Sequence, residues 1–134
     1  MTMSDSNRAL LDTNVVIALF GGEPLIVERI QACIQVYVPV TVLGELYYGA
    51  LRSTRRSDNV ARLEEFARRV AVLPCMPEAA RVYGRIKAAL RAKGRPIPEN
   101  DIWIAALALQ HDLTVLSKDS HFTEIEGLSL NLLD

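Results

Sequence analysis

Five short apolar runs, each separated from the next by a longer segment with helical periodicity, constrain the fold of this chain more than any other feature. The runs predict strands at residues 8–12, 36–39, 70–73, 113–117 and 128–133. Short β-branched runs without strict alternation are typical of strands covered on both faces. Strands joined by helices form parallel sheets through right-handed crossovers. We therefore predict an α/β fold with a central parallel sheet of about five strands sandwiched between helices.

The segments between these strands have the spacing of amphipathic helices. They predict helices at residues 24–34, 40–52, 58–69, 77–93 and 100–111. Pro24 stands in a first helical turn, where proline is favoured, and Gly94 follows the fourth helix as a typical C-terminal stop. The chain has 134 residues and no repeat, low-complexity tract or linker. We therefore expect residues 1–134 to form one domain.

The termini and cysteines indicate the cellular setting. The N-terminal segment lacks a basic region followed by an apolar stretch, so we expect no signal peptide. No apolar run approaches the roughly 18 residues that cross a membrane. Cys33 and Cys75 lie in apolar stretches and match no zinc spacing, so we expect both to be reduced core residues. These features predict a cytoplasmic protein without a membrane partner.

The charge balance limits how the chain could bind nucleic acid. Its net charge is −1, whereas proteins that bind duplex nucleic acid by charge alone are usually far more basic. Any surface that binds phosphate must therefore be local, or bound metal must supply the positive charge.

Four acidic residues stand where a parallel sheet would gather them. Asp12 and Asp119 follow the first and fourth predicted strands, and Asp101 begins the last helix. Glu45 lies within an otherwise apolar helix. Ligands of open α/β sheets bind beyond the carboxyl ends of the strands, so we expect these side chains to converge there.

Ordinary structural roles remain open for each acid. Asp12 suits a helix N-cap, and Asp119 suits a turn. Either Asp101 or its neighbour Asn100 is expected to cap the last helix. Glu45 fits a solvated helix face.

Convergence of four carboxylates would favour a bound cation, because like charges at close range repel one another. An all-oxygen ligand set suits a hard divalent ion such as Mg²⁺ or Mn²⁺. Such an ion activates water and stabilises charge on a phosphoryl group. The chemistry that fits best is hydrolysis of a phosphodiester.

Four segments, in this order and spanning nearly the whole chain, carry a resemblance to a known family. They are LLDTNV at residues 10–15, GELYYG at 44–49, NDIWIAA at 100–106 and LSKDSHF at 116–122. With these segments the chain resembles the PIN-domain ribonucleases and, within them, the VapC-type toxins of bacterial toxin–antitoxin pairs.

The resemblance implies a site and a reaction. Asp12, Glu45, Asp101 and Asp119 would be catalytic and hold one or two divalent ions, Mg²⁺ or Mn²⁺, with Asp119 acting directly or through water. Residues at three matching positions would orient acids or waters: Thr13, Asn14 and Ser117. The family cleaves single-stranded or looped RNA and leaves a 3′-hydroxyl and a 5′-phosphate. It also implies a cognate VapB-type antitoxin and a homodimer.

Other polar residues have two interpretations. Two basic clusters form either solvated faces or contacts with RNA phosphates; they are Arg52, Arg55 and Arg56, and Arg91, Lys93 and Arg95. His111 and His121 do not have the spacing of a metal-ligand pair, and we expect structural or surface roles for both.

Two rival functions remain open from the sequence. One is a Mg²⁺-dependent phosphotransfer protein or phosphatase that uses Asp12. The phosphatase pattern requires an acid two residues later, where Asn14 stands. The other is a non-catalytic binding module in which the four acids are only caps and turns.

Overall fold

The computed structural model describes residues 7–133 of the chain. The N-terminal segment in which we expect no signal peptide lies almost wholly outside these residues. The strands are β1 Arg8–Leu11, β2 Gln35–Pro39, β3 Ala71–Leu73, β4 Thr114–Ser117 and β5 Leu130–Leu132. The helices are α1 Thr13–Phe20, α2 Pro24–Gln31, α3 Val40–Arg52, α4 Arg56–Arg69, α5 Pro77–Ala92, α6 Glu99–His111 and the short 3₁₀ helix η2 Ser120–Glu124.

The five strands form one parallel sheet in the order β3-β2-β1-β4-β5. β1 is central, and its residues Ala9, Leu10 and Leu11 are fully buried. Complete burial explains why these three residues are all apolar instead of alternating with polar ones. The predicted α/β fold with a five-stranded parallel sheet is confirmed.

The main errors in the predicted elements are α1 and η2, which were not predicted. The sequence of α1, TNVVIALF, is apolar almost throughout, so periodicity does not distinguish it from a buried strand. η2 is a short turn-like element of five residues. The predicted helix at residues 24–34 is also too long: α2 ends at Gln31, because the chain must turn before β2 begins at Gln35.

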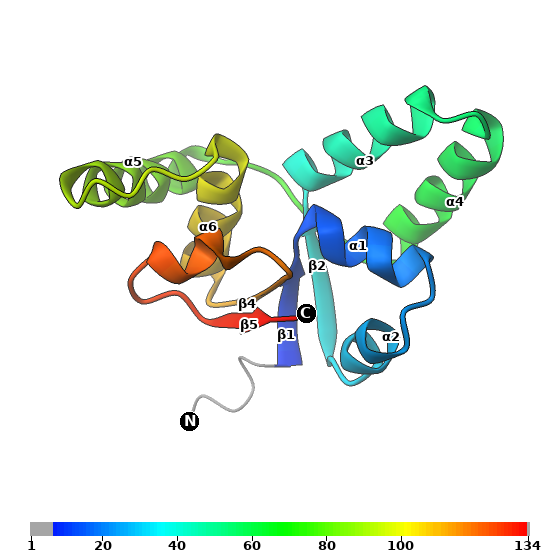
Figure 1. Cartoon of the computed structure of the whole chain (residues 1–134), viewed down its shortest axis with the longest axis horizontal. Helices are drawn as coiled ribbons and strands as arrows, with labels where there is room; N and C mark the ends of the chain where they lie inside the picture. The colour runs from blue at the N-terminus through cyan, green and yellow to red at the C-terminus, as the bar shows by residue number, and fades with distance from the viewer. Residues whose placement is uncertain (1–6, 134) are drawn as a thin grey trace.

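Two helix pairs lie on either side of the carboxyl end of β1. Figure 1 shows α3 with α4 on one side and α5 with α6 on the other, while α1 starts between them directly after β1. Since all strands run in parallel, their carboxyl ends share this edge of the sheet. The segments that follow β1 and β4 therefore lie at this edge. They meet the first turn of α6 there, between the two helix pairs.

The predicted core positions of the cysteines are only partly right. Both thiols are free, but Cys75 is exposed and Cys33 is half-buried. Cys75 lies between Pro74 and Pro77 in the connection from β3 to α5, and the two prolines keep this apolar stretch out of regular structure. Among residues 7–133, no helix is both long and apolar enough to cross a membrane.

Candidate active site

Asp12 is buried at the junction of β1 and α1. Its backbone N–H donates to the Leu116 carbonyl at 3.0 Å, which continues the pairing of β1 with β4. Its Oδ1 accepts from the Thr13 backbone N–H at 2.8 Å, and its Oδ2 accepts from the Ser117 hydroxyl at 2.6 Å. The N-cap interpretation of Asp12 is therefore correct. The charges of Asp119 and Glu45 also act on this carboxylate, so capping does not exclude a site.

The surroundings of Asp12 change the pKa of its carboxyl group. Burial raises the pKa of Asp12 above its ordinary value, and the charges of Asp119 and Glu45 add to the increase. Hydrogen bonds from Ser117 and Thr13 act in the opposite direction. The rise means that the ionised carboxylate is not fully compensated by the protein alone.

Asp101 lies in the first turn of α6 and is 7% exposed. The expectation that Asn100 or Asp101 caps this helix is wrong, because Pro98 occupies the N-cap position and no side chain caps the helix. Burial, with smaller contributions from the charges of Asp12 and Asp119, raises the pKa of Asp101 to about 6, despite an opposing hydrogen bond with His121.

Glu45 reaches the site from α3. Its Oε1 accepts a hydrogen bond from the Thr13 hydroxyl at 2.6 Å and another from the Asn100 side-chain amide at 2.7 Å. These bonds link α3 to the first turns of α1 and α6. Glu45 is exposed, as the solvated-face interpretation expects, but its carboxylate is fixed in place and does not simply project into water.

Ser117 and Asn14 organise the segment after β4. The buried Ser117 hydroxyl accepts from the Asp119 backbone N–H at 2.8 Å while it donates to Asp12. Asn14 Oδ1 accepts from the Lys118 backbone N–H at 3.1 Å. Asp119 in turn caps η2, since its Oδ1 accepts from the His121 backbone N–H at 2.9 Å. The turn role of Asp119 is therefore present together with its position among the acids.

His121 belongs to the cluster, although the sequence predicted only a structural or surface role for it. Its ring Nδ1 lies 2.9 Å from Asp119 Oδ1 and 3.1 Å from Asp101 Oδ2. Among the described residues, Asp101, Asp119 and His121 form a group whose ligand atoms all lie within 4.8 Å of one another. The sequence feature that could have indicated this role is the position of His121, two residues after Asp119 in the turn that Asp119 caps.

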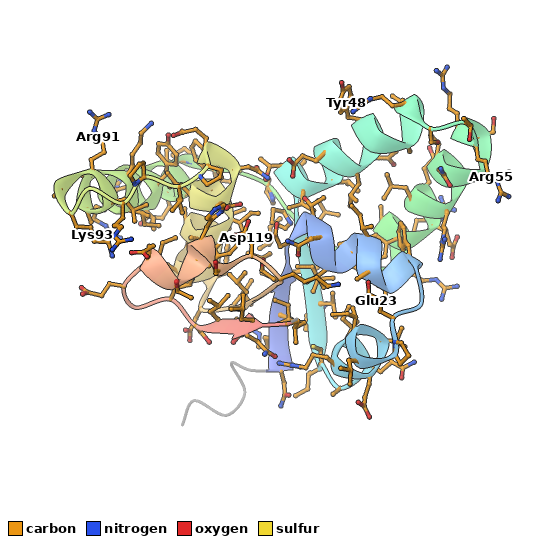
Figure 2. All side chains as sticks on the ribbon, viewed as in Figure 1. Glu23, Tyr48, Arg55, Arg91, Lys93 and Asp119 are labelled. Atoms are coloured by element: carbon orange, nitrogen blue, oxygen red, sulfur yellow. The ribbon has the colours of Figure 1, made fainter. Side chains whose placement is uncertain are left out.

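The two predicted basic clusters do not join the acids. Figure 2 shows Asp119 between the helix pairs, Arg55 at the far end of α3 and α4, and Arg91 and Lys93 at the far end of α5. Arg55 pairs with Asp58 at 3.1 Å, and Lys93 pairs with Glu124 at 3.6 Å. Any contact of these cations with RNA would therefore be remote from the acids.

The rest of the first cluster is also engaged locally. The Arg52 guanidinium lies over the Tyr48 ring, 5.2 Å from its centroid. Arg56 Nε donates to the Leu51 carbonyl at 2.9 Å. In the second cluster, Arg95 is exposed in the connection between α5 and α6.

An apolar pocket of about 350 Å³ adjoins the acids. Thr13 and Glu45 line it at the side of the site, and Ile17, Phe20 and Leu63 are among its apolar lining residues. It lies between α1, α3 and α4. The acidic centre therefore continues into a surface suited to an apolar side chain.

Comparisons with known proteins identify the family. The PIN domain family matches residues 9–128. The chain is 39% identical over 114 residues to Ribonuclease VapC2 of Haemophilus influenzae, covering 84% of this chain and 86% of that protein. It is 34% identical over 125 residues to Ribonuclease VapC5 of Mycobacterium tuberculosis, covering 88% and 87%.

A solved structure agrees with these relatives. The structure of DNA-bound VapBC from Salmonella typhimurium superposes with a TM-score of 0.85 at 31% identity, covering 92% of this chain and 96% of that one. These matches decide against the phosphotransfer protein and the non-catalytic binding module. The chain belongs to the PIN-domain family and, within it, to the VapC family of ribonuclease toxins.

Proposed function

We propose that Asp12, Glu45, Asp101 and Asp119 hold one or two Mg²⁺ or Mn²⁺ ions and that this site hydrolyses RNA phosphodiesters. The observation that carries the proposal is the burial of two carboxylates, Asp12 and Asp101, whose pKa values are raised mainly by burial and further by the charge of Asp119. A bound cation would compensate both charges.

The donor set fits a hard divalent ion. Asp12 receives hydrogen bonds from neutral groups, the Ser117 hydroxyl and the Thr13 backbone N–H. Neutral donors leave the carboxylate its negative charge and further lone pairs. Oxygen ligands from a few carboxylates, completed by water, are typical of Mg²⁺ and Mn²⁺ sites.

When bound, such an ion lowers the pKa of a coordinated water and stabilises negative charge on the phosphoryl oxygens. The side chains have separate tasks. Ser117 fixes the orientation of Asp12, and the α6 N-terminus favours the ionised form of Asp101. Thr13 and Asn100 both bind Oε1 of Glu45. The other oxygen of this exposed carboxylate would then help to hold the cation.

Purified protein and RNA provide a test of this function. Cleavage is expected with Mg²⁺ or Mn²⁺, and mapping of the fragment ends should find 3′-hydroxyl and 5′-phosphate termini. Excess chelator should abolish the fragments and added Mg²⁺ should restore them. Full cleavage in excess chelator would contradict the proposed mechanism.

We further propose that a cognate VapB-type antitoxin covers the site. The apolar pocket between α1, α3 and α4 would receive an apolar side chain from an extended or helical segment. A basic side chain of the same segment would enter the acidic centre beside Glu45. The solved Salmonella relative is a VapBC complex, which supports a partner of this kind.

Two expectations about surfaces belong to the same proposal. RNA phosphates would contact the basic clusters at the ends of the helix pairs, and two copies of the chain would form a homodimer. Tyr48 and Leu51, which are exposed on α3, would suit an interface. Light scattering of the purified protein measures its oligomeric state directly.

A further inference from the structure

His121 is held in a defined position against two of the acids. The neighbouring Phe122 is 1% exposed and anchors η2 in the core. Asp119 caps the same element by accepting from the His121 backbone N–H. These constraints direct the imidazole toward the carboxylates even though its side chain is 49% exposed.

The distances around His121 Nδ1 are those of adjacent metal ligands. Two ligands at right angles, each about 2.1 Å from the same ion, lie about 3.0 Å apart. Nδ1 is 2.9 Å from Asp119 Oδ1 and 3.1 Å from Asp101 Oδ2. Both distances therefore match those of adjacent ligand positions around one cation, and the ligand atoms of the whole group lie within 4.8 Å of one another.

We propose that His121 is a direct ligand, through Nδ1, of a divalent cation held by Asp101 and Asp119. This inference rests on the proposed metal-dependent function and adds a nitrogen donor to an otherwise all-oxygen site. Imidazole binds transition metals better than it binds Mg²⁺. The nitrogen donor therefore shifts the preference of the site from Mg²⁺ toward Mn²⁺.

The alternative role for His121 is a hydrogen bond without metal contact. In that arrangement Nδ1 carries a proton, donates it to the two carboxylates and only positions them. Hydrogen-bond distances are similar to ligand–ligand distances, so the two roles require a measurement that reports on the metal–nitrogen bond itself.

Pulsed electron paramagnetic resonance of the untagged, Mn²⁺-loaded chain makes that measurement. The chain has two histidines, and His111 provides a matched control. It stands in the last turn of α6, about 15 Å along the helix axis from Asp101 at 1.5 Å per residue. Wild type and His111→Ala should show the strong nitrogen hyperfine coupling of a directly bound imidazole, and His121→Ala should lack it.

His121→Asn is the second test variant, because it keeps a polar side chain in the turn while removing the imidazole. It should also lose the coupling. In titrations followed by calorimetry, both His121 variants should bind Mn²⁺ about tenfold or more weakly, with a smaller loss for Mg²⁺. Circular dichroism checks that each variant remains folded.

The outcomes separate this inference from the proposed function. Bound Mn²⁺ without nitrogen coupling in wild type would overturn the ligand role of His121 and leave a metal-dependent nuclease intact. Equal losses of Mn²⁺ and Mg²⁺ affinity in the His121 variants would overturn the proposed selectivity. Absence of any Mn²⁺ or Mg²⁺ binding by the folded wild type would overturn both.

Discussion

A single residue of this site can satisfy two requirements at once. Asp12 caps α1 and is also acted on by the charges of other acids, and Asp119 caps η2 while it contacts His121. Sequence reasoning treats a cap and a metal ligand as alternatives, because each role alone explains an aspartate. The structure reconciles them, because a carboxylate oxygen has more than one lone pair: Asp119 Oδ1 both caps η2 and lies against His121 Nδ1.

Asp101→Asn should stabilise the metal-free protein. The pKa of Asp101 is about 6 in the folded state against an ordinary 3.8, so ionisation costs the folded protein more than the unfolded chain. The cost is absent below about pH 4, grows as pH rises toward 6, and is complete above it. At neutral pH, a shift of roughly two pKa units corresponds to about 3 kcal/mol at most.

Urea unfolding in chelator, from pH 4 to pH 8, checks this prediction. The advantage of Asp101→Asn over wild type in free energy of unfolding should grow across that window and then level off. In Mg²⁺, wild type should regain stability by mass action and the variant should gain less. A difference that does not change with pH would mean that Asp101 ionises without penalty.

At the scale of elements, Ser117 and Glu45 connect segments that are distant in sequence. Ser117 at the end of β4 binds Asp12 after β1, and Glu45 on α3 joins α1 to α6. The sheet was predictable because short apolar runs mark its central strands, such as Ala9–Leu11 in β1 and Val115–Leu116 in β4. α1 was not, because a helix buried on most sides has no polar face to reveal its period.

Ser117→Ala should destabilise the protein by about 1–3 kcal/mol, because it removes a buried hydroxyl that serves both Asp12 and Asp119. Ser120→Ala is the matched control, since Ser120 is exposed nearby, and it should be almost neutral. Urea unfolding in Mg²⁺-free buffer compares them. Equal effects of the two substitutions would contradict the organising role of Ser117.

Thr13→Val should reduce RNA cleavage about 10- to 100-fold because Glu45 loses one of its two hydrogen-bond donors. Thr13→Ser keeps the hydroxyl and should retain most activity. Cleavage rates at saturating Mg²⁺ measure both variants. If valine and serine gave the same rate, the hydroxyl would have no part in positioning Glu45.

At the scale of the whole molecule, the acids lie between two helix pairs whose ends carry the basic clusters (Figure 2). The sequence predicted the sheet because short apolar runs are local patterns. Of the four acids that it predicted to converge at the carboxyl edge, the structure brings carboxylate oxygens of Asp101 and Asp119 within 4.8 Å of each other. The sequence could not predict that His121 joins the acids, since this depends on the turn made by η2. It also could not place Arg55 and Arg91 away from the acids, because helix length and direction decide this.

Expression of the chain alone should slow bacterial growth, and co-expression of a cognate antitoxin should relieve the effect. The reason is membership of the VapC ribonuclease toxins together with a pocket beside Glu45 that an antitoxin segment would fill. Growth curves after induction measure this. Normal growth with abundant folded protein would count against a toxin role.

The most direct test of the acidic site is the dependence of RNA cleavage on Mg²⁺ concentration in wild type, Asp12→Asn and Asp112→Asn. Asp112 is an exposed acid after α6 with a left-handed backbone conformation that asparagine accepts, so it controls for the loss of one charge. We predict saturable, Mg²⁺-dependent cleavage by wild type and Asp112→Asn, and no cleavage by Asp12→Asn at any Mg²⁺ concentration. Cleavage by Asp12→Asn at the wild-type rate and with the wild-type Mg²⁺ dependence would contradict a metal site that includes Asp12.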